Sequence, residues 1–241
     1  MDRKVIDELA PHGVLRVGVN MANTLLVSGT DANGDPVGVS ADVGREIAAR
    51  LGVPVRYVKY ASPGEVADDV GNDAWDIANI GAEPQRAEAI LFTPAYCEIE
   101  ATCLVPPNSP IRSLAEMDVA GRRIATKARA AYTLWLERTI RHADLILVPP
   151  TTDAFDVFVR DGLDALAGLR TQLSKAAGRM EGARILDGKF TAVQQAIGTA
   201  RTNMQAAAWL TEFVGEAKAS GLIARLIDRH RVDGLSVPVG D

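Results

Sequence analysis

Segments with strand-like and helix-like patterns alternate along this chain in two successive blocks, and this alternation restricts the fold more than any other feature. In the first block the strand patterns lie at residues 14–20, 53–60 and 75–77. In the second block they lie at 123–126, 145–148 and 163–169, each followed by a helical pattern, at 130–140, 152–160 and 171–179. Such alternation is typical of α/β folds with mostly parallel sheets. We therefore expect two α/β lobes.

Two proline-bounded extended segments, near residues 98–106 and 189–195, separate the blocks and return the chain to the first one. We expect both to be crossovers, so that the second lobe is inserted into the first. The predicted boundaries are residues 1–98 for the first part of lobe 1, 99–193 for lobe 2 and 194–241 for the return. The predicted fold class is α/β, with two Rossmann-like lobes, mixed sheets and two hinge crossovers.

Capping residues mark the ends of several helices. Ser40 is expected to cap a helix whose apolar side chains recur at i, i+4 and i+8 and which ends at Gly52. Residues 62–65 form a capping box with proline at the first helical position, and Gly71 is expected to close that helix. Helices over 202–220 and 222–230 are expected to complete the chain.

The charge and hydropathy of the chain exclude several partners. Because 26 Lys and Arg face 31 Asp and Glu, the net charge is −5, and we expect no nucleic acid partner. No run of about 18 apolar residues occurs, so no membrane insertion is expected. Residues 1–8 are charged and contain no apolar h-region. We therefore expect either the mature form of a periplasmic protein or a cytoplasmic protein, in both cases a monomer.

Residue types that hold metals or cofactors are scattered. His12, His142 and His230 lack metal-ligand spacing, and no phosphate loop or nucleophile motif occurs. Cys97 and Cys103 lie in a segment with an extended pattern, which separates them by about 20 Å and prevents a disulfide. We expect two free thiols, no cofactor and no metal.

The stretch at residues 78–86 is the first candidate site. Pro84 suits the first position of a short helix, because its missing N–H would have no helical partner there. The N–H groups of a helix start attract anions, and Arg86 can donate two parallel hydrogen bonds to a carboxylate. The alternative is a surface turn in which Arg86 is solvated or pairs with Glu88.

Taken in order, several segments resemble the family 3 solute-binding proteins, which serve ABC importers of polar amino acids. Residues 13–19 are similar to the family's first strand, and residues 34–43 to its GxxxGFDVDL segment. The third match is between residues 76–96 and the pattern DAIIAGMTITPERxxxxxFSxPY. Residues 109–121 resemble the beginning of the family's second domain, and 164–166 its DAVVAD strand. The resemblance covers nearly the whole chain and implies a type II periplasmic binding fold that closes on a ligand in a cleft between two lobes.

The resemblance also implies which residues of lobe 1 hold the ligand. In the family, the arginine of the TPER turn binds the ligand's carboxylate, and the matching residue here is Arg86. Other groups of that turn assist, which implies Asn79, Gly81 and Glu83 as contacts. These three residues replace the family's usual small hydroxyl residues, so the usual contacts with an amino acid are altered.

The larger departure from the family lies in lobe 2. The DAVVAD strand ordinarily ends in an acidic residue that receives the ligand's ammonium group, but the matching residue here is Leu169, followed by Arg170. A one-residue shift of the alignment restores no acid, since none lies between Asp164 and Glu181. The family's GTT loop is replaced by residues 126–132, which add basic residues and Tyr132.

These departures favour an acid over an amino acid as ligand. An ammonium group buried without a carboxylate would cost several kcal/mol. Arg86 from one lobe and Arg129 or Arg170 from the other would instead favour a small organic acid with one or two acidic groups. The alternatives are that Arg170 points to solvent at a helix start and that Arg129 belongs to a solvated basic cluster.

Four further residues are candidates for the cleft. Asn23 follows the first strand, and Gln194 and Gln195 lie at the second crossover, where one of them could face the cleft. Tyr132 could form an aromatic wall, or it could instead pack against Trp135.

The leading functional hypothesis is a non-enzymatic binding protein that closes on a small carboxylate and is recognised by the membrane subunit of an ABC importer. One alternative is an enzyme similar to the cyclohexadienyl dehydratases of the same fold, with Glu83 or Glu100 as the general acid. A cytoplasmic ligand sensor is a further alternative.

Overall fold

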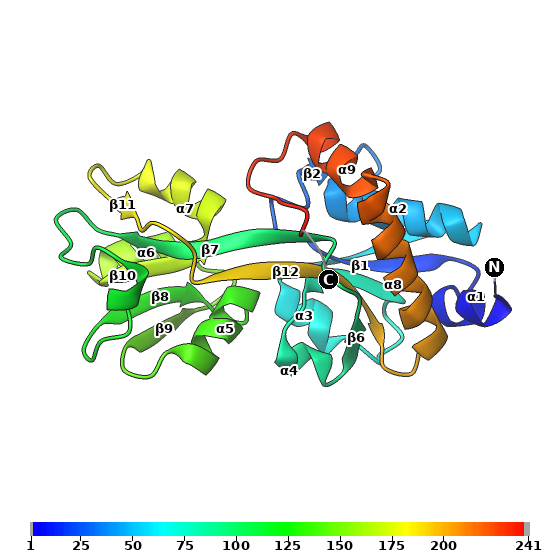
Figure 1. Ribbon diagram of the computed structural model, residues 1–241, viewed down its shortest axis with the longest axis horizontal. Coiled ribbons are helices and arrows are strands. Elements are labelled where there is room, and N and C mark those ends of the chain that lie inside the picture. The colour runs from blue at the N-terminus through cyan, green and yellow to red at the C-terminus, as the bar shows by residue number, and fades with distance from the viewer. Residues whose placement is uncertain (1, 239–241) are drawn as a thin grey trace. The chain divides into compact units, whose positions relative to one another are not determined.

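The computed structural model describes residues 2–238, so Met1 and residues 239–241 at the ends of the predicted lobe 1 lie outside the described part. The chain divides into two compact units, which are Met1–Glu98 with Gln194–Asp241, and Ile99–Val193. We call them unit 1 and unit 2 (Figure 1). Both passages between the units fall within strands, β7 (Cys97–Val105) and β12 (Thr191–Ala200).

The sheet of unit 1 is mixed. Strands β4 (Val55–Tyr60), β1 (Leu15–Asn20) and β5 (Ile77–Gly81) are parallel, and β12 is antiparallel to β5. The short β6 (Ile90–Phe92) is antiparallel to β12. Since β1 and β5 run in the same direction, their carboxyl ends lie at the same edge of the sheet.

Both faces of this sheet are covered by apolar side chains. In β5, Ile77 belongs to one hydrophobic cluster, whereas Ala78 and Ile80 belong to another, as the alternation of side chains along a strand requires. The first cluster includes residues of four helices, α1 (Arg3–Leu9), α2 (Val39–Leu51), α8 (Met204–Ala219) and α9 (Leu222–His230). The second includes Val66 of α3 (Pro63–Asp68). A strand covered on both faces explains why β5 shows no alternation of apolar and polar residues.

Several local features of unit 1 differ from the prediction. The expectation that Ser40 caps α2 is wrong, because the N-cap is Gly38. The backbone of Gly38 has φ of 144°, and a Cβ there would lie 2.3 Å from the carbonyl oxygen of Leu26. Only glycine fits this close approach. Helix α1 and the short strands β2 (Gly29–Thr30) and β3 (Pro36–Val37) were not predicted.

The capping box before α3 is confirmed in part. The Ser62 side chain accepts a hydrogen bond from the Glu65 backbone N–H at 3.2 Å, and Glu65 accepts one from the N–H of Ala61 at 3.0 Å. The helix ends at Asp68, and its C-cap is Asp69. Gly71 lies two residues beyond this C-cap and therefore does not close the helix.

A buried ion pair joins β1 to the start of β5. The guanidinium of Arg16 donates to Asp76 through Nε at 3.1 Å and Nη2 at 2.7 Å, and the Arg16 backbone N–H donates to the same carboxylate at 2.7 Å. Both side chains are almost completely buried, with exposed fractions of 5% and 3%. The pairing holds the two neighbouring strands in register at their amino ends.

The strands of unit 2 also run in mixed directions. Strands β10 (Ala165–Leu169), β8 (Arg123–Lys127) and β9 (Asp144–Val148) are parallel. Strand β7 is antiparallel to β10, and β11 (Arg184–Ile185) is antiparallel to β7. The predicted α/β class with mixed sheets is therefore confirmed.

The helices of unit 2 cover both faces of its sheet. One hydrophobic cluster joins Ala125 and Leu166 to residues of α6 (Ala154–Arg160) and α7 (Arg170–Ala177). The other joins Ile124 and Ala165 to Leu136 of α5 (Ala131–Thr139) and to the 3₁₀ turn η1 (Leu114–Glu116). Cys97 and Cys103 are both free and buried in β7, as expected.

Candidate functional site

The carboxyl end of β5 leads directly into the turn that the sequence singled out. Strand β5 ends at Gly81, and Pro84 is the first residue of the short helix α4 (Pro84–Ala87), as predicted. The carbonyl oxygen of Glu83, the N-cap, accepts hydrogen bonds from the N–H groups of Arg86 and Ala87, each at 2.9 Å. The local sequence therefore fixes this turn.

Arg86 folds back over the end of its own strand. Its side chain is buried, with 6% of the residue exposed, and Nη1 donates to the carbonyl oxygen of Gly81 at 2.6 Å. A guanidinium has five N–H donors in a rigid plane, and the donor that binds Gly81 fixes this plane at the end of β5. The alternative of a solvated surface arginine does not agree with this burial.

Asn79 lies two residues before Gly81 on the same face of β5. Its Nδ2 donates to the carbonyl oxygen of Ser40 at 2.9 Å, which joins β5 to the first turn of α2. Its Oδ1 is buried, and no described residue donates a hydrogen bond to it. A buried acceptor without a donor costs about 1–3 kcal/mol, so a ligand or water donor at this atom would be favourable.

The other predicted residues of unit 1 differ in whether they contact this turn. Gln195 is buried in β12 directly opposite Gly81, and the carbonyl oxygen of Gln194 accepts from the N–H of Ala82 at 2.8 Å. The side chain of Gln194 donates to Glu98 at 2.9 Å. Asn23 is half-buried in the loop after β1, where its Oδ1 accepts from the N–H of Leu25 at 3.3 Å. Asn23 thus also shapes its own loop.

In unit 2 the two predicted arginines have different surroundings. Arg170, the first residue of α7, donates through Nε to Glu100 at 2.9 Å and through Nη2 to the carbonyl oxygen of Gly188. Arg129 is exposed in the turn between β8 and α5, with a left-handed φ of 63°. Neither lines the pocket described next.

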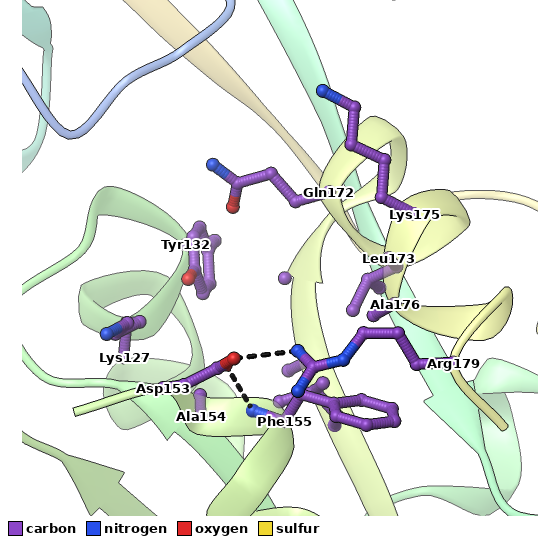
Figure 2. Close-up of a pocket in the computed structure, with 13 residues that line it drawn as sticks. Lys127, Tyr132, Asp153, Ala154, Phe155, Gln172, Leu173, Lys175, Ala176 and Arg179 are labelled. Atoms are coloured by element: carbon purple, nitrogen blue, oxygen red, sulfur yellow. Dashed lines mark hydrogen bonds and ion pairs between the residues drawn. The ribbon is translucent and has the colours of Figure 1, made fainter.

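Unit 2 contains a pocket with a volume of about 260 Å³ beside the carboxyl ends of β8 and β10 (Figure 2). It is lined by Lys127, Tyr132, Asp153, Ala154, Phe155, Leu166, Ala167, Gly168, Gln172, Leu173, Lys175, Ala176 and Arg179. Tyr132 is therefore the one predicted residue of unit 2 that lines it. Burial raises the pKa of the Tyr132 hydroxyl, so this group stays protonated at neutral pH.

An ion pair closes one side of the pocket. Asp153 accepts from Nη1 of Arg179 at 2.7 Å and, as the N-cap of α6, from the N–H of Phe155 at 2.9 Å. The hydrogen bond from Arg179 lowers the pKa of Asp153. Arg179 also donates to Asp156 at 2.6 Å and lies 4.2 Å from the centre of the Phe155 ring. Asp153 is therefore ionised, and each of its two oxygens already accepts one hydrogen bond.

Lys127 is the last residue of β8 and also lines the pocket. Its ammonium donates to the carbonyl oxygens of Pro150, at 2.9 Å, and Thr152. Burial lowers the pKa of Lys127, while the charge of Asp153 opposes this shift. The prediction treated Lys127 as part of a solvated basic cluster and did not single out Phe155, Gln172 or Arg179. The Asp-Ala-Phe sequence at 153–155, a helix cap shortly after the strand that ends at Val148, was the available signal.

The described residues form neither a metal centre nor a membrane-spanning helix. Within residues 2–238, no three His, Cys, Asp or Glu side chains gather in a way that could hold a metal ion. Over the same residues, no helix combines the length and apolar character needed to cross a bilayer.

Comparison with known proteins gives the fold and the family. The chain is 23% identical over 216 residues to the probable amino-acid ABC transporter periplasmic-binding protein y4tE of Sinorhizobium fredii (strain NBRC 101917 / NGR234), covering 84% of this chain and 70% of that protein. The structure is similar to that of a mutant of ArgBP from T. maritima, with a TM-score of 0.73, 20% identity, and coverage of 93% of this chain and 98% of that one.

A second solved structure has the same fold. It is the ancestral amino acid-binding protein AncCDT-1, a precursor of cyclohexadienyl dehydratase, with a TM-score of 0.74, 18% identity, and coverage of 93% of this chain and 97% of that one. At these identities the solved structures establish the type II periplasmic binding fold alone. The family model described as bacterial extracellular solute-binding proteins, family 3, matches residues 15–232. The chain therefore belongs to family 3 of the bacterial extracellular solute-binding proteins.

Proposed function

We propose that the protein captures a small organic acid for an ABC importer and that Arg86 binds the carboxylate of this acid. The observation that carries the proposal is the buried guanidinium at the carboxyl end of β5, held at 2.6 Å by the carbonyl oxygen of Gly81. Asn79, Gly81 and Glu83 complete the proposed half-site in unit 1, with Gln195 opposite Gly81. The family and the printed function of the Sinorhizobium relative support the link to an importer.

The end of β10 supports an acid without an ammonium group. Leu169 is buried there, and the neighbouring carboxylate of Glu100 already pairs with Arg170 at 2.9 Å and Lys189 at 3.7 Å. An ammonium group brought to this strand end would have to displace one of these cations or remain unpaired, which costs several kcal/mol when buried. The names of the relatives favour an amino acid instead, so the two ligand classes must be compared directly.

Binding is proposed to be coupled to closure of the two units. The closing motion would bend the chain in β7 and β12, the strands in which it passes from one unit to the other. A periplasmic location is proposed with this role. We propose no general acid, because Glu100, one of the two candidates, already forms ion pairs with two cations.

The test is calorimetric titration of the full chain with succinate, glutarate, glutamate and arginine, before and after replacement of Arg86 by Met. We expect a dicarboxylate to bind more tightly than its amino analogue. The variant should weaken binding about 30-fold or more, because removing one partner of a buried charge pair costs about 2–5 kcal/mol.

Arg201→Met is the matched control for this experiment. Arg201 also donates from Nη1 to a carbonyl oxygen, that of Ala87 at 2.6 Å, but it is exposed. The control should bind like the parent protein. Tight binding of glutamate or arginine with no binding of simple carboxylates would reject the proposed ligand class, and an unchanged affinity in the Arg86 variant would reject the site. Native mass spectrometry of the purified protein would identify any retained acid by mass.

A further inference from the structure

We propose that the pocket of unit 2 accepts an aromatic ring of the solute and that the cations at this pocket attract the solute's carboxylate, so that the solute is an aromatic carboxylic acid without an ammonium group. This inference rests on the proposed function, because it assumes that an organic acid is captured. It assigns to unit 2 the selection of the solute's apolar part.

The volume of the pocket agrees with a substituted ring. A dry apolar cavity of about 150 Å³ is sufficient to hold benzene. The pocket of unit 2 measures about 260 Å³, which leaves space for a substituent the size of a carboxylate. A short aliphatic acid would leave much of this space empty and would gain little from burial.

The walls of the pocket are apolar where a ring would lie. Phe155, Leu166 and Leu173 are buried members of one hydrophobic cluster and line the pocket. The buried Tyr132 contributes a second aromatic ring from the opposite side (Figure 2). Ala176 has only a methyl group at its position in α7, and this small side chain keeps the space open. An aromatic ring between Phe155 and Tyr132 would gain both buried area and ring contacts.

The polar groups of the pocket favour an acceptor over a donor. Both oxygens of Asp153 already accept hydrogen bonds, from Arg179 and from the Phe155 N–H. Lys127 has three N–H donors, of which two bind carbonyl oxygens, so one remains for a ligand. The side chain of Gln172 makes no hydrogen bond to any described residue and extends across the pocket toward Tyr132 (Figure 2).

The charges of the residues that line the pocket also favour an acid as the solute. Lys127, Lys175 and Arg179 are cations, whereas Asp153 is the one carboxylate among the lining residues, all of which are described. A carboxylate on the ring would be attracted by this excess of positive charge. An ammonium group in the same place would meet like charges and would find the oxygens of Asp153 already occupied.

A set of three matched compounds tests the class of solute by calorimetric titration of the full chain. Phenylpyruvate is the expected type of ligand, phenylalanine adds an ammonium group to the same skeleton, and pyruvate lacks the ring. We expect phenylpyruvate to bind at least tenfold more tightly than either of the other two. Equal or tighter binding of phenylalanine or of pyruvate would overturn the inference.

A pocket-filling variant tests the location. Ala176→Phe should place a ring in the pocket and reduce the affinity for phenylpyruvate at least tenfold, while leaving the affinity for pyruvate unchanged. The matched control is Ser174→Phe, because Ser174 is exposed on the same helix and does not line the pocket. Should Ala176→Phe fail to fold, Ala176→Leu replaces it, with a smaller loss expected. Unchanged affinity for phenylpyruvate in a folded variant would overturn the inference.

Lys127→Met separates the anionic end from the ring. We expect this variant to lose affinity for phenylacetate at least fivefold and to bind phenylacetamide as before. A wild-type affinity for phenylacetate would reject the role of Lys127. If no carboxylate binds to the parent protein, or Arg86→Met has no effect, the proposed function itself fails. If aliphatic acids bind through Arg86 and the unit 2 variants change nothing, the inference about the pocket alone fails.

Discussion

The two units share one architecture but differ in whether they bury charged side chains. Among the described residues, every buried charged side chain lies in unit 1, namely Arg16, Asp42, Asp76, Glu83 and Arg86. The buried polar residues of unit 2 are all hydroxyl-bearing, namely Thr102, Ser109, Thr126 and Thr133. The charged residues around the unit 2 pocket remain partly or fully exposed at its rim. Buried charge is costly and therefore needs fixed partners, whereas rim charge does not.

This difference suggests a division of tasks between the units. In unit 1 the buried ions and the turn at Arg86 hold a cation in one position, which suits a group that every accepted solute carries. In unit 2 an apolar cavity is bordered by exposed and partly exposed charges, which suits selection by size and shape. Three predictions test this comparison, beginning with the largest expected effect.

Removal of the Asp76 charge should produce the largest loss of stability. Asp76→Asn leaves the buried Arg16 guanidinium without its main partner, and breaking a buried pair in this way costs about 3–5 kcal/mol. Urea denaturation followed by circular dichroism measures the loss. The matched control is Asp73→Asn, since Asp73 pairs with the same arginine but its side chain is 69% exposed, and a much smaller loss is expected. Similar losses in the two variants would contradict the importance of burial.

Substitutions of two glycines with positive φ, one in each unit, test how closely each glycine is packed. Gly38→Ala in unit 1 should cost about 3 kcal/mol or more, because the new Cβ would lie 2.3 Å from the Leu26 carbonyl oxygen. Gly121→Ala in unit 2 should cost about 1–2 kcal/mol, because φ is 82° but no atom lies within 4 Å of the added Cβ. Thermal unfolding of both variants measures the difference, and a smaller effect at Gly38 would show that its loop can move aside.

The smallest effect concerns the pH dependence of stability. Burial would raise the pKa of Asp42, but hydrogen bonds from His230 and Arg45 outweigh burial, so the pKa is lowered. Because the folded pKa lies below the unfolded value of about 3.9, the stabilisation is fully present above that pH. It is lost as the pH falls through the folded pKa. Asp42→Asn should therefore reduce the loss of unfolding free energy between pH 7 and pH 2, which is the acid limb of the stability curve. Urea denaturation over this pH range measures the loss.

Asp118 provides the comparison in unit 2. Backbone N–H groups, first that of Ala143, lower the pKa of Asp118, with burial acting in the opposite direction. The side chain accepts these hydrogen bonds near the surface, so Asp118→Asn should change the acid limb less than Asp42→Asn. A larger change at Asp118 would show that unit 2 depends on its carboxylates as strongly as unit 1 does.

The turn that carries Arg86 could be predicted from the sequence because its signals are local. Pro84 at the start of α4, the strand before it and Arg86 one turn later all lie within ten residues, and the turn is closed by its own backbone hydrogen bonds. The capping of α2 could not be predicted correctly, because the close approach of Gly38 to Leu26 depends on how a loop packs. Periodicity and capping residues carry no information about such contacts.

The pocket of unit 2 shows what sequence patterns could not reveal. Asp153 and Arg179 meet although 26 positions separate them, and Lys127 donates to carbonyl oxygens more than 20 positions away. In the sequence, Lys127 belongs to a basic cluster like those found on solvated surfaces. Its position beside Tyr132 and Phe155 arises because parallel strands bring their carboxyl ends together.

The sequence by itself determined the order of strands and helices, the α/β class and the turn that carries Arg86, because periodicity, capping residues and proline act over a few neighbouring residues. Only the tertiary structure decided which charges are buried and where a cavity remains. Arg16 and Asp76 are 60 residues apart, and their burial depends on the pairing of β1 with β5. Burial and cavity volume are properties of contacts between distant segments, and these contacts exist only after the chain has folded.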